Sequence, residues 1–312
     1  MTIKLYENFR SVFYSPFYLV EALGFYRDEG LDVRIIGSDA PQPIPGPDAE
    51  DIWWGGPMRL LVGRDHDPAC QLVGFCEVVT RDPFFLIGSE PRPSFQMSDL
   101  KDYRLATVSE VPTPWMCLQD DHRQAGINPD SLDRIGDRTM EDNVRAFQDG
   151  TVDVIQVFEP YVTNLLSEDQ GHIWYVSASR GATSYTTLFA NRHTVADRRA
   201  ECLAMTRAMY RMQLWLRENE VSEIAAVLAP YFPTLDATTL TDCINRYKSA
   251  GIWGKNPILP RDGFERLRDA CLSGGLIKYG ATYEDCIDGE LAQAAMQEVD
   301  GNKGVTPSNA EF

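Results

Sequence analysis

The sequence lacks the local motifs by which most catalytic and nucleotide-binding sites are recognised. It contains no G-x-G-x-x-G, no phosphate loop ending in G-K-S/T, no H-E-x-x-H and no G-x-S-x-G. The four histidines are scattered, and no two of them have a spacing that is typical of a shared metal. Spacing alone therefore indicates no catalytic constellation, and we expect neither a metal nor a cofactor.

Positive charge and long apolar runs are also scarce. The 29 Lys and Arg against 46 Asp and Glu give a formal net charge of -17, which argues against a nucleic acid partner because duplex binding needs a basic surface. No stretch has the 18 apolar residues of a membrane span, and the start, MTIKLYENF, lacks the features of a signal peptide. As it stands, the sequence predicts a cytoplasmic protein, or a periplasmic or extracytoplasmic one if a signal peptide was removed.

The seven cysteines form no C-x-x-C pair, which suggests reduced thiols. Cys117, in PTPWMCLQD, has two interpretations. It is either a nucleophile near a helix start, where the pKa of a thiol falls, or a buried helix cysteine. We favour the buried cysteine.

The order of the predicted elements indicates two α/β lobes followed by helices. Residues 2–36 give a strand, a helix that Ser15 caps with Pro16 at its first position, and a second strand. A second strand-and-helix set follows in residues 86–165, and later residues are helical. We predict lobe 1 from residues 1–85 and 183–300, lobe 2 from residues 86–182, and a disordered tail from residues 301–312.

Four segments resemble one family. They are SPFYLVEALGFYRDEGLDVRII, DIWWGGPMRLL, SDLKDYRLATV and AFQDGTVDVIQVFEPYV, in this order. Together they are similar to the periplasmic-binding-protein-like family of nitrate, sulfonate, taurine and thiamine-pyrimidine-precursor binding proteins of ABC transporters. The resemblance implies the two-lobed type II fold, in which each lobe is a mixed sheet flanked by helices, with a helical C-terminal region. It also implies a ligand cleft between the lobes.

Such sheets bind ligands at the carboxyl ends of their strands, which selects the candidate site residues. In Asp51–Leu61 we expect one tryptophan in the core and the other as a stacking wall, with both in the core as the alternative. The two glycines after them would let a ligand approach the backbone. The predicted ligand-binding residues are Asn8, Phe9, Tyr14, Gly37, Ser38, Trp53, Trp54, Gly55, Gly56, Arg59, Arg81, Pro112, Thr113, Trp115, Glu159, Tyr185 and Thr186.

Glu159 has two interpretations: a hydrogen-bond partner for a ligand ring, or a helix-start carboxylate satisfied by backbone amides. Arg59 would pair with an anionic group or lie on the surface.

We expect an ABC-transporter-type substrate-binding protein that holds a small aromatic or heteroaromatic molecule, with an anionic group as one option. Its partners would be that ligand and, as an option, an ABC permease. One alternative is a cytosolic ligand sensor. Another is an enzyme on the same fold, a decarboxylase or lyase that uses Glu159, Tyr14 or Asp82 as acid–base groups.

A pyrimidine-precursor synthase is disfavoured because Gly55 and Arg59 stand where that group has its lysine and histidine. A sulfinate desulfinase is disfavoured because the first loop, RSVFYSPFY, has no cysteine.

Overall fold

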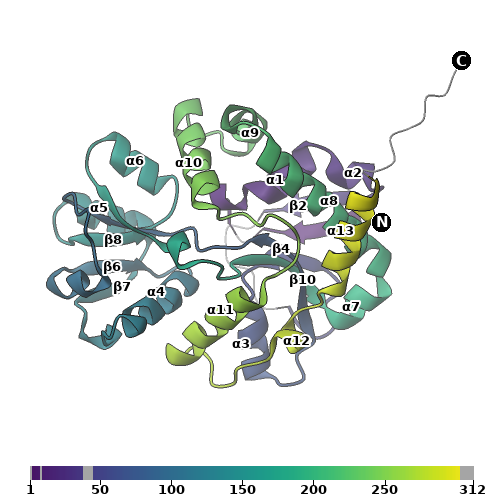
Figure 1. Cartoon of the computed structure of the whole chain (residues 1–312), viewed down its shortest axis with the longest axis horizontal. Helices are drawn as coiled ribbons and strands as arrows, with labels where there is room; N and C mark the ends of the chain where they lie inside the picture. Colours follow the sequence, from purple (N-terminus) through teal and green to yellow (C-terminus); the bar gives the residue numbers. More distant parts are fainter. Residues whose placement is uncertain (1, 8, 38–44, 303–312) are drawn as a thin grey trace, which may run out of the picture.

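The computed structural model describes residues 2–7, 9–37 and 45–302, and its strands form two five-stranded sheets in separate lobes (Figure 1). The sheet of lobe 1 has the order β2 (Asp32–Ile36), β1 (Thr2–Tyr6), β3 (Ile52–Gly55), β10 (Thr186–Asn191) and β4 (Leu72–Val79). The sheet of lobe 2 has the order β7 (Arg134–Arg138), β6 (Leu105–Val108), β8 (Val154–Val157), β5 (Phe85–Gly88) and β9 (His172–Val176).

Both sheets are mixed, as the family resemblance implied. In lobe 1, β1 pairs in parallel with β2 and β3, whereas β10 runs antiparallel to β3 and β4. In lobe 2, β6 pairs in parallel with β7 and β8, whereas β5 runs antiparallel to β8 and β9. The parallel strands point their carboxyl ends the same way, so the segments that follow them gather at one edge of each sheet.

Helices cover the sheets and account for most of the second half of the chain. They are α1 (Ser15–Ala22), α2 (Phe25–Asp28), α3 (Met58–His66), α4 (Thr113–Gln124), α5 (Met140–Gln148), α6 (Tyr161–Ser167), α7 (Arg192–Asp197), α8 (Arg199–Glu218), α9 (Val221–Leu228), α10 (Ala237–Ala250), α11 (Arg261–Ser273), α12 (Tyr283–Cys286) and α13 (Glu290–Asn302). Of these, α4, α5 and α6 belong to lobe 2. None of the helices in the described ranges is long and apolar enough to span a membrane.

Two sequence predictions of local structure need correction. Ser15 does not cap α1: it is the first helical residue, and its hydroxyl donates a hydrogen bond to the carbonyl of Val12 in the preceding turn. Helix α13 ends at Asn302, so it includes the first two residues of the segment expected to be a disordered tail. The other ten residues of that segment, 303–312, lie outside the described residues.

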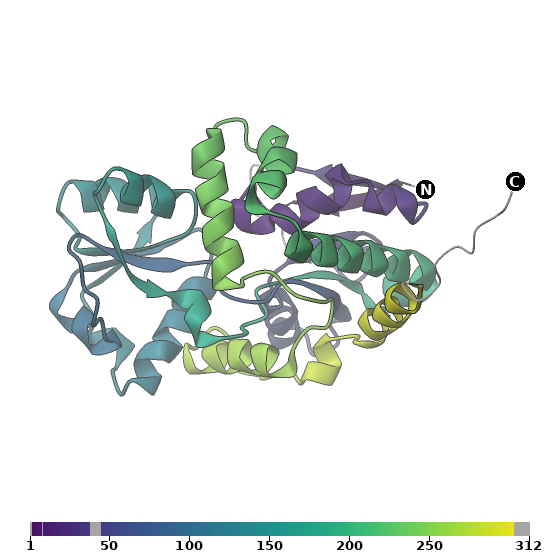
Figure 2. The same cartoon turned by 45° about the horizontal axis from the view of Figure 1, so that its top comes forward.

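Two helices that follow the return of the chain to lobe 1 also contact lobe 2. Helices α10 and α11 lie between the lobes on opposite sides of the molecule (Figure 2). Helix α11 packs on α4, where the buried Cys117 of lobe 2 shares an apolar cluster with Leu267, Ala270 and Cys271. The lobes are therefore joined by helix packing as well as by the two crossings of the chain.

The strand β4 that leads to the first crossing carries a buried carboxyl group, Glu77, which is 3% exposed. Its Oε1 has no hydrogen-bond partner within the described part of the chain. Burial raises the pKa of Glu77 well above its ordinary value of 4.5, and the hydroxyls of Thr80 and Ser184 oppose this shift only in part. The folded chain therefore binds this proton more tightly than the unfolded chain does, so the contribution of Glu77 to the free energy of unfolding falls as the pH rises above 4.5.

Replacing Glu77 with Gln should raise the free energy of unfolding by at least about 1 kcal/mol at pH 7, because the amide needs no ionisation. The gain should shrink as the pH falls towards 4.5, where the carboxyl group of the unfolded chain is also protonated. Urea unfolding at about pH 4, 5, 6 and 7 measures it. Glu141→Gln, at an exposed position, is the control. An equal effect of Glu77→Gln at every pH would contradict this reasoning.

Candidate functional site at the interlobe junction

Aromatic side chains from both lobes meet where β1 and β8 end. Phe9 follows β1, Phe158 follows β8, and their rings are nearly parallel, with centroids 6.2 Å apart. Phe13 contacts both of them edge-on, and Tyr14 and Tyr185 pack on Phe13 at centroid distances of 4.2 and 5.9 Å. We call these five residues the aromatic junction. Phe13, Tyr14 and Tyr185 are buried, whereas Phe9 and Phe158 are only half-buried.

The two tryptophans of β3 point to opposite faces of the sheet, and both belong to the core. Trp54 is 1% exposed and stacks on Phe17 of α1 at 4.1 Å, with Tyr14 beside it at 5.6 Å. Trp53 is 9% exposed and lies between Tyr6 and Phe189 on the other face. Burial thus supports the alternative interpretation, in which neither tryptophan is a freely exposed wall.

The two glycines after these tryptophans make room for protein groups. A Cβ atom at Gly55 would lie 3.1 Å from Nε of Arg59 and 3.2 Å from the ring of Phe189. A Cβ atom at Gly56 would lie 3.3 Å from the carbonyl oxygen of Tyr185. The glycines therefore allow Arg59 and the residue before β10, Tyr185, to lie close to the backbone. From the sequence we expected a ligand at this place.

Arg59 is a cationic side chain that reaches the tip of β3. It lies in the first turn of α3, half-buried, and burial lowers the pKa of its guanidinium, while the nearby Tyr14 opposes that shift. Desolvation weakens the hydration of this positive charge, so a ligand anion at this place would gain a strong, charge-assisted hydrogen bond. Arg59 as an anion partner remains a prediction.

Glu159 is fully buried and joins the lobes. Its Oε1 accepts a hydrogen bond from Nε of Arg246 in α10 at 2.6 Å, and its Oε2 accepts one from the backbone amide of Thr163 in α6 at 2.9 Å. The thiol of Cys243 lies 3.5 Å from Oε2, and the backbone amide of Glu159 donates to the phenol oxygen of Tyr247. The bond from the Thr163 amide agrees with the helix-start interpretation of Glu159, and the ion pair with Arg246 is a contact that the sequence did not predict.

Other predicted residues contact different parts of the protein. The hydroxyl of Thr113, at the start of α4, donates to the sulfur of Met58 in lobe 1 at 3.5 Å, with Pro112 just before it. Arg81 donates to the carbonyl of Ala250 at the end of α10. Gly37 is exposed at the end of β2, and Thr186 is buried within β10. Asn8 and Ser38 lie outside the described residues.

Trp115 faces the separate core of lobe 2 and is not brought to the junction. Its ring lies 4.1 Å from the guanidinium carbon of Arg134 and packs against the cluster that contains Leu118. The period of the helix explains this placement: Trp115 lies in the first turn of α4, two residues after Thr113, and side chains two apart on a helix point in different directions. Its ligand role stays an untested prediction without support from its position.

Two candidate acid–base groups of the enzyme alternative, Glu159 and Asp82, form ion pairs within the protein. Asp82 is fully buried, pairs with Arg180 at 2.6 Å and accepts the amide of Phe84 at 2.9 Å. Burial raises the pKa of Asp82, and Arg180 opposes this shift. Burial likewise raises the pKa of the Cys117 thiol, which supports the buried-cysteine interpretation. Within the described ranges, no three His, Cys, Asp or Glu side chains form a candidate metal site.

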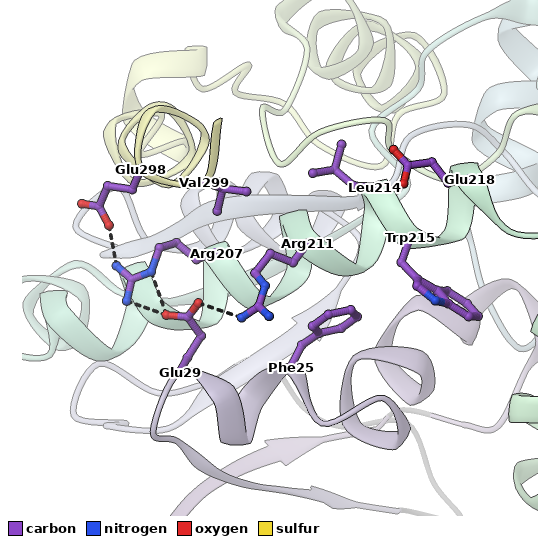
Figure 3. A pocket seen from close by; sticks show the side chains of 9 residues that line it. All are labelled: Phe25, Glu29, Arg207, Arg211, Leu214, Trp215, Glu218, Glu298 and Val299. Atoms are coloured by element: carbon purple, nitrogen blue, oxygen red, sulfur yellow. Dashed lines mark hydrogen bonds and ion pairs between the residues drawn. The ribbon is translucent and has the colours of Figure 1, made fainter. Parts of the chain in front are cut away.

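A cavity of about 750 Å³ lies elsewhere, on lobe 1 between α2, α8 and α13 (Figure 3). Its arginines are paired with its own carboxylates: Arg207 with Glu29 and Glu298, and Arg211 with Glu29. None of the predicted site residues lines it. The aromatic junction therefore remains the candidate site. Sequence reasoning missed two of its residues: Phe13, and Phe158, which the strand-end rule would have selected.

Breaking the pair between Glu159 and Arg246 should be costly. Arg246→Met should lower the free energy of unfolding by about 3 kcal/mol, because it leaves a buried carboxylate without its cation. Chemical denaturation measures the change. Arg145→Met, which removes an arginine from an exposed pair with Glu141, should cost under about 0.5 kcal/mol. Equal costs for the two variants would show that the interlobe pair contributes no more than a surface pair.

Comparison with known proteins agrees with this architecture. Residues 87–229 match the model of the NMT1-like family. YtlA of Bacillus subtilis strain 168, itself a proposed binding protein, is 24% identical over 95% of this chain and 90% of its own length.

Two solved structures have the same fold. The alkanesulfonate-binding protein SsuA from Xanthomonas axonopodis pv. citri, bound to MOPS, is 12% identical, with a TM-score of 0.67 over 93% of this chain and 98% of its own. A mutant of the desulfurization enzyme DSZB, in complex with biphenyl-2-sulfinic acid, is 12% identical, with a TM-score of 0.63 over 95% and 99%. The predicted resemblance is confirmed: this chain has the two-lobed type II periplasmic-binding-protein fold, and its residues 87–229 match the NMT1-like family.

Proposed function

We propose that this chain is a substrate-binding protein of the ABC-transporter type, which holds one small molecule between its lobes and delivers it to a permease. The observation that carries the proposal is the aromatic junction, in which side chains from both lobes meet at the carboxyl ends of β1 and β8. A ligand held there contacts both lobes at once, so that its binding energy favours the closed arrangement.

The proposed ligand is aromatic or heteroaromatic and carries an anionic group. Phe9 and Phe158 offer half-buried ring faces, on which a flat apolar molecule gains stacking and burial. Arg59 offers a partly desolvated positive charge at the tip of β3. Two proteins of the same fold support the anionic group, since one is bound to MOPS, a sulfonate, and the other to biphenyl-2-sulfinic acid. Only the second of these ligands is aromatic, because the morpholine ring of MOPS is saturated.

The second candidate is an enzyme on this fold, because DSZB is one. Against it stand the ion pairs that occupy the carboxylates of Glu159 and Asp82. The two functions differ in the fate of the ligand: a binding protein returns it intact, whereas an enzyme converts it.

Native mass spectrometry of the purified chain, mixed with arenesulfonates, aromatic carboxylates and pyrimidines, tests the proposal. We expect one intact adduct per chain with at least one class, and its mass identifies the class. A new small-molecule mass, with consumption of the added compound, would instead assign the site to an enzyme. Absence of any adduct across the panel would contradict the proposed ligand chemistry.

Arg59→Met should weaken the binding of benzenesulfonate at least about 10-fold, the loss expected for one charge-assisted contact, with a smaller effect on an uncharged pyrimidine. Isothermal titration calorimetry measures both affinities. Arg34→Met, on the exposed face of β2, is the matched control and should leave both unchanged. If benzenesulfonate binds Arg59→Met as tightly as the parent chain, Arg59 is not the anion partner.

A further inference from the structure

Phe9 and Phe158 are the two members of the aromatic junction that are not fully packed. Each follows the carboxyl end of a parallel strand, β1 in lobe 1 and β8 in lobe 2. Their ring planes differ by only 7°, and their centroids are 6.2 Å apart. The rings around them are mostly buried and meet them at steep angles, so this pair presents the parallel, half-buried faces of the junction.

Both rings are held in place by packing on their other sides. Phe158 meets Phe84 at 5.1 Å and Phe13 at 5.5 Å, both nearly perpendicular. Phe9 meets Phe13 at 6.0 Å and Tyr14 at 5.5 Å. Side chains that neighbours already fix lose little conformational entropy when a ligand contacts them, which favours affinity.

The backbone beneath Phe158 is fixed as well. The next residue, Glu159, donates its amide to the phenol oxygen of Tyr247 and pairs its carboxylate with Arg246, both from α10 of lobe 1. The position of the Phe158 ring is therefore set by contacts that themselves join the two lobes.

We infer that Phe9 and Phe158 form a ring clamp, in which a planar ligand ring enters between the two phenyl faces, and that Phe158 is the residue by which lobe 2 selects flat rings. The inference rests on the proposed function. A ring held between two faces needs about 3.5 Å on each side, so the centroids must move at least about 7 Å apart. In the present structure the centroids are 6.2 Å apart, so the two rings must move apart before a ligand ring can enter.

The clamp predicts selection by shape as well as by charge. Benzenesulfonate and cyclohexanesulfonate carry the same anionic group, but only the first has a flat ring with a π face. Stacking on two phenyl faces should favour benzenesulfonate by about 5- to 10-fold, and the puckered ring should gain only from burial of apolar surface. The ratio of the two affinities therefore reports on the clamp and is insensitive to Arg59.

Calorimetric titration of the full chain with both sulfonates tests the clamp. The parent chain should show the preference for the flat ring, and Phe158→Leu should reduce the ratio to near unity, mainly by weakening benzenesulfonate. Phe95→Leu is the matched control, because Phe95 is another half-buried phenylalanine of lobe 2 that packs on Trp174, away from the junction. It should keep the ratio of the parent chain.

Phe9→Leu removes the other face of the clamp and should have the same effect, so it carries the test if Phe158→Leu does not fold. An unchanged ratio in the folded clamp variants would overturn the clamp and leave the proposed function standing. Parent chain that binds both sulfonates equally would also overturn it. Parent chain that binds neither sulfonate, nor any other member of the panel, would overturn the proposed function and the clamp together.

Discussion

The arrangement of the two lobes depends on a buried carboxylate. Glu159 belongs to lobe 2, yet its charge is balanced by Arg246 of α10, and its backbone amide is bound by Tyr247 of the same helix. A buried carboxylate without a partner is costly, so the ion pair with Arg246 favours the packing of α10 against lobe 2. That contact places the end of β8 opposite the end of β1. Phe158 directly precedes Glu159, so this contact helps to hold Phe158 near Phe9 in the site that we propose.

The fold could be predicted well because its signals in the sequence are local. These signals act over a few residues. They include the alternation in TIKLY, the apolar run VDVIQVF, and Gly24 and Gly30, which both have positive φ. The order of these elements along the chain indicated two lobes, and the resemblance of four short segments then implied the type II fold. Ser15 does not cap the helix because its hydroxyl donates to the carbonyl of Val12 in the preceding turn, Val12–Tyr14. The helix begins at Ser15, one residue earlier than predicted.

The candidate site was predicted less completely, because its contacts join residues far apart in the chain. Glu159 pairs with Arg246, which lies 87 residues later in the chain. The sequence around either residue contains no pattern that indicates this partner. The rule that strand ends face the ligand selected Phe9, Tyr14 and Tyr185, which the fold brings together, and also Trp115, which packs on the core of lobe 2. It selected Gly55 and Gly56 as well, and in the fold Arg59 and the carbonyl of Tyr185 lie close to them. Whether protein groups or a ligand fill the space beside a glycine depends on contacts between residues far apart in the chain, which sequence patterns do not show.

The packing of α11 on α4 supplies the protein with an internal reporter of lobe motion. Cys117 is buried in an apolar cluster that also contains Leu267, Ala270 and Cys271 of the opposite lobe. A motion that separates α11 from α4 would open this cluster to a thiol reagent in water. The rate at which Cys117 is modified would then report on that motion, and a ligand that holds the lobes together would slow it.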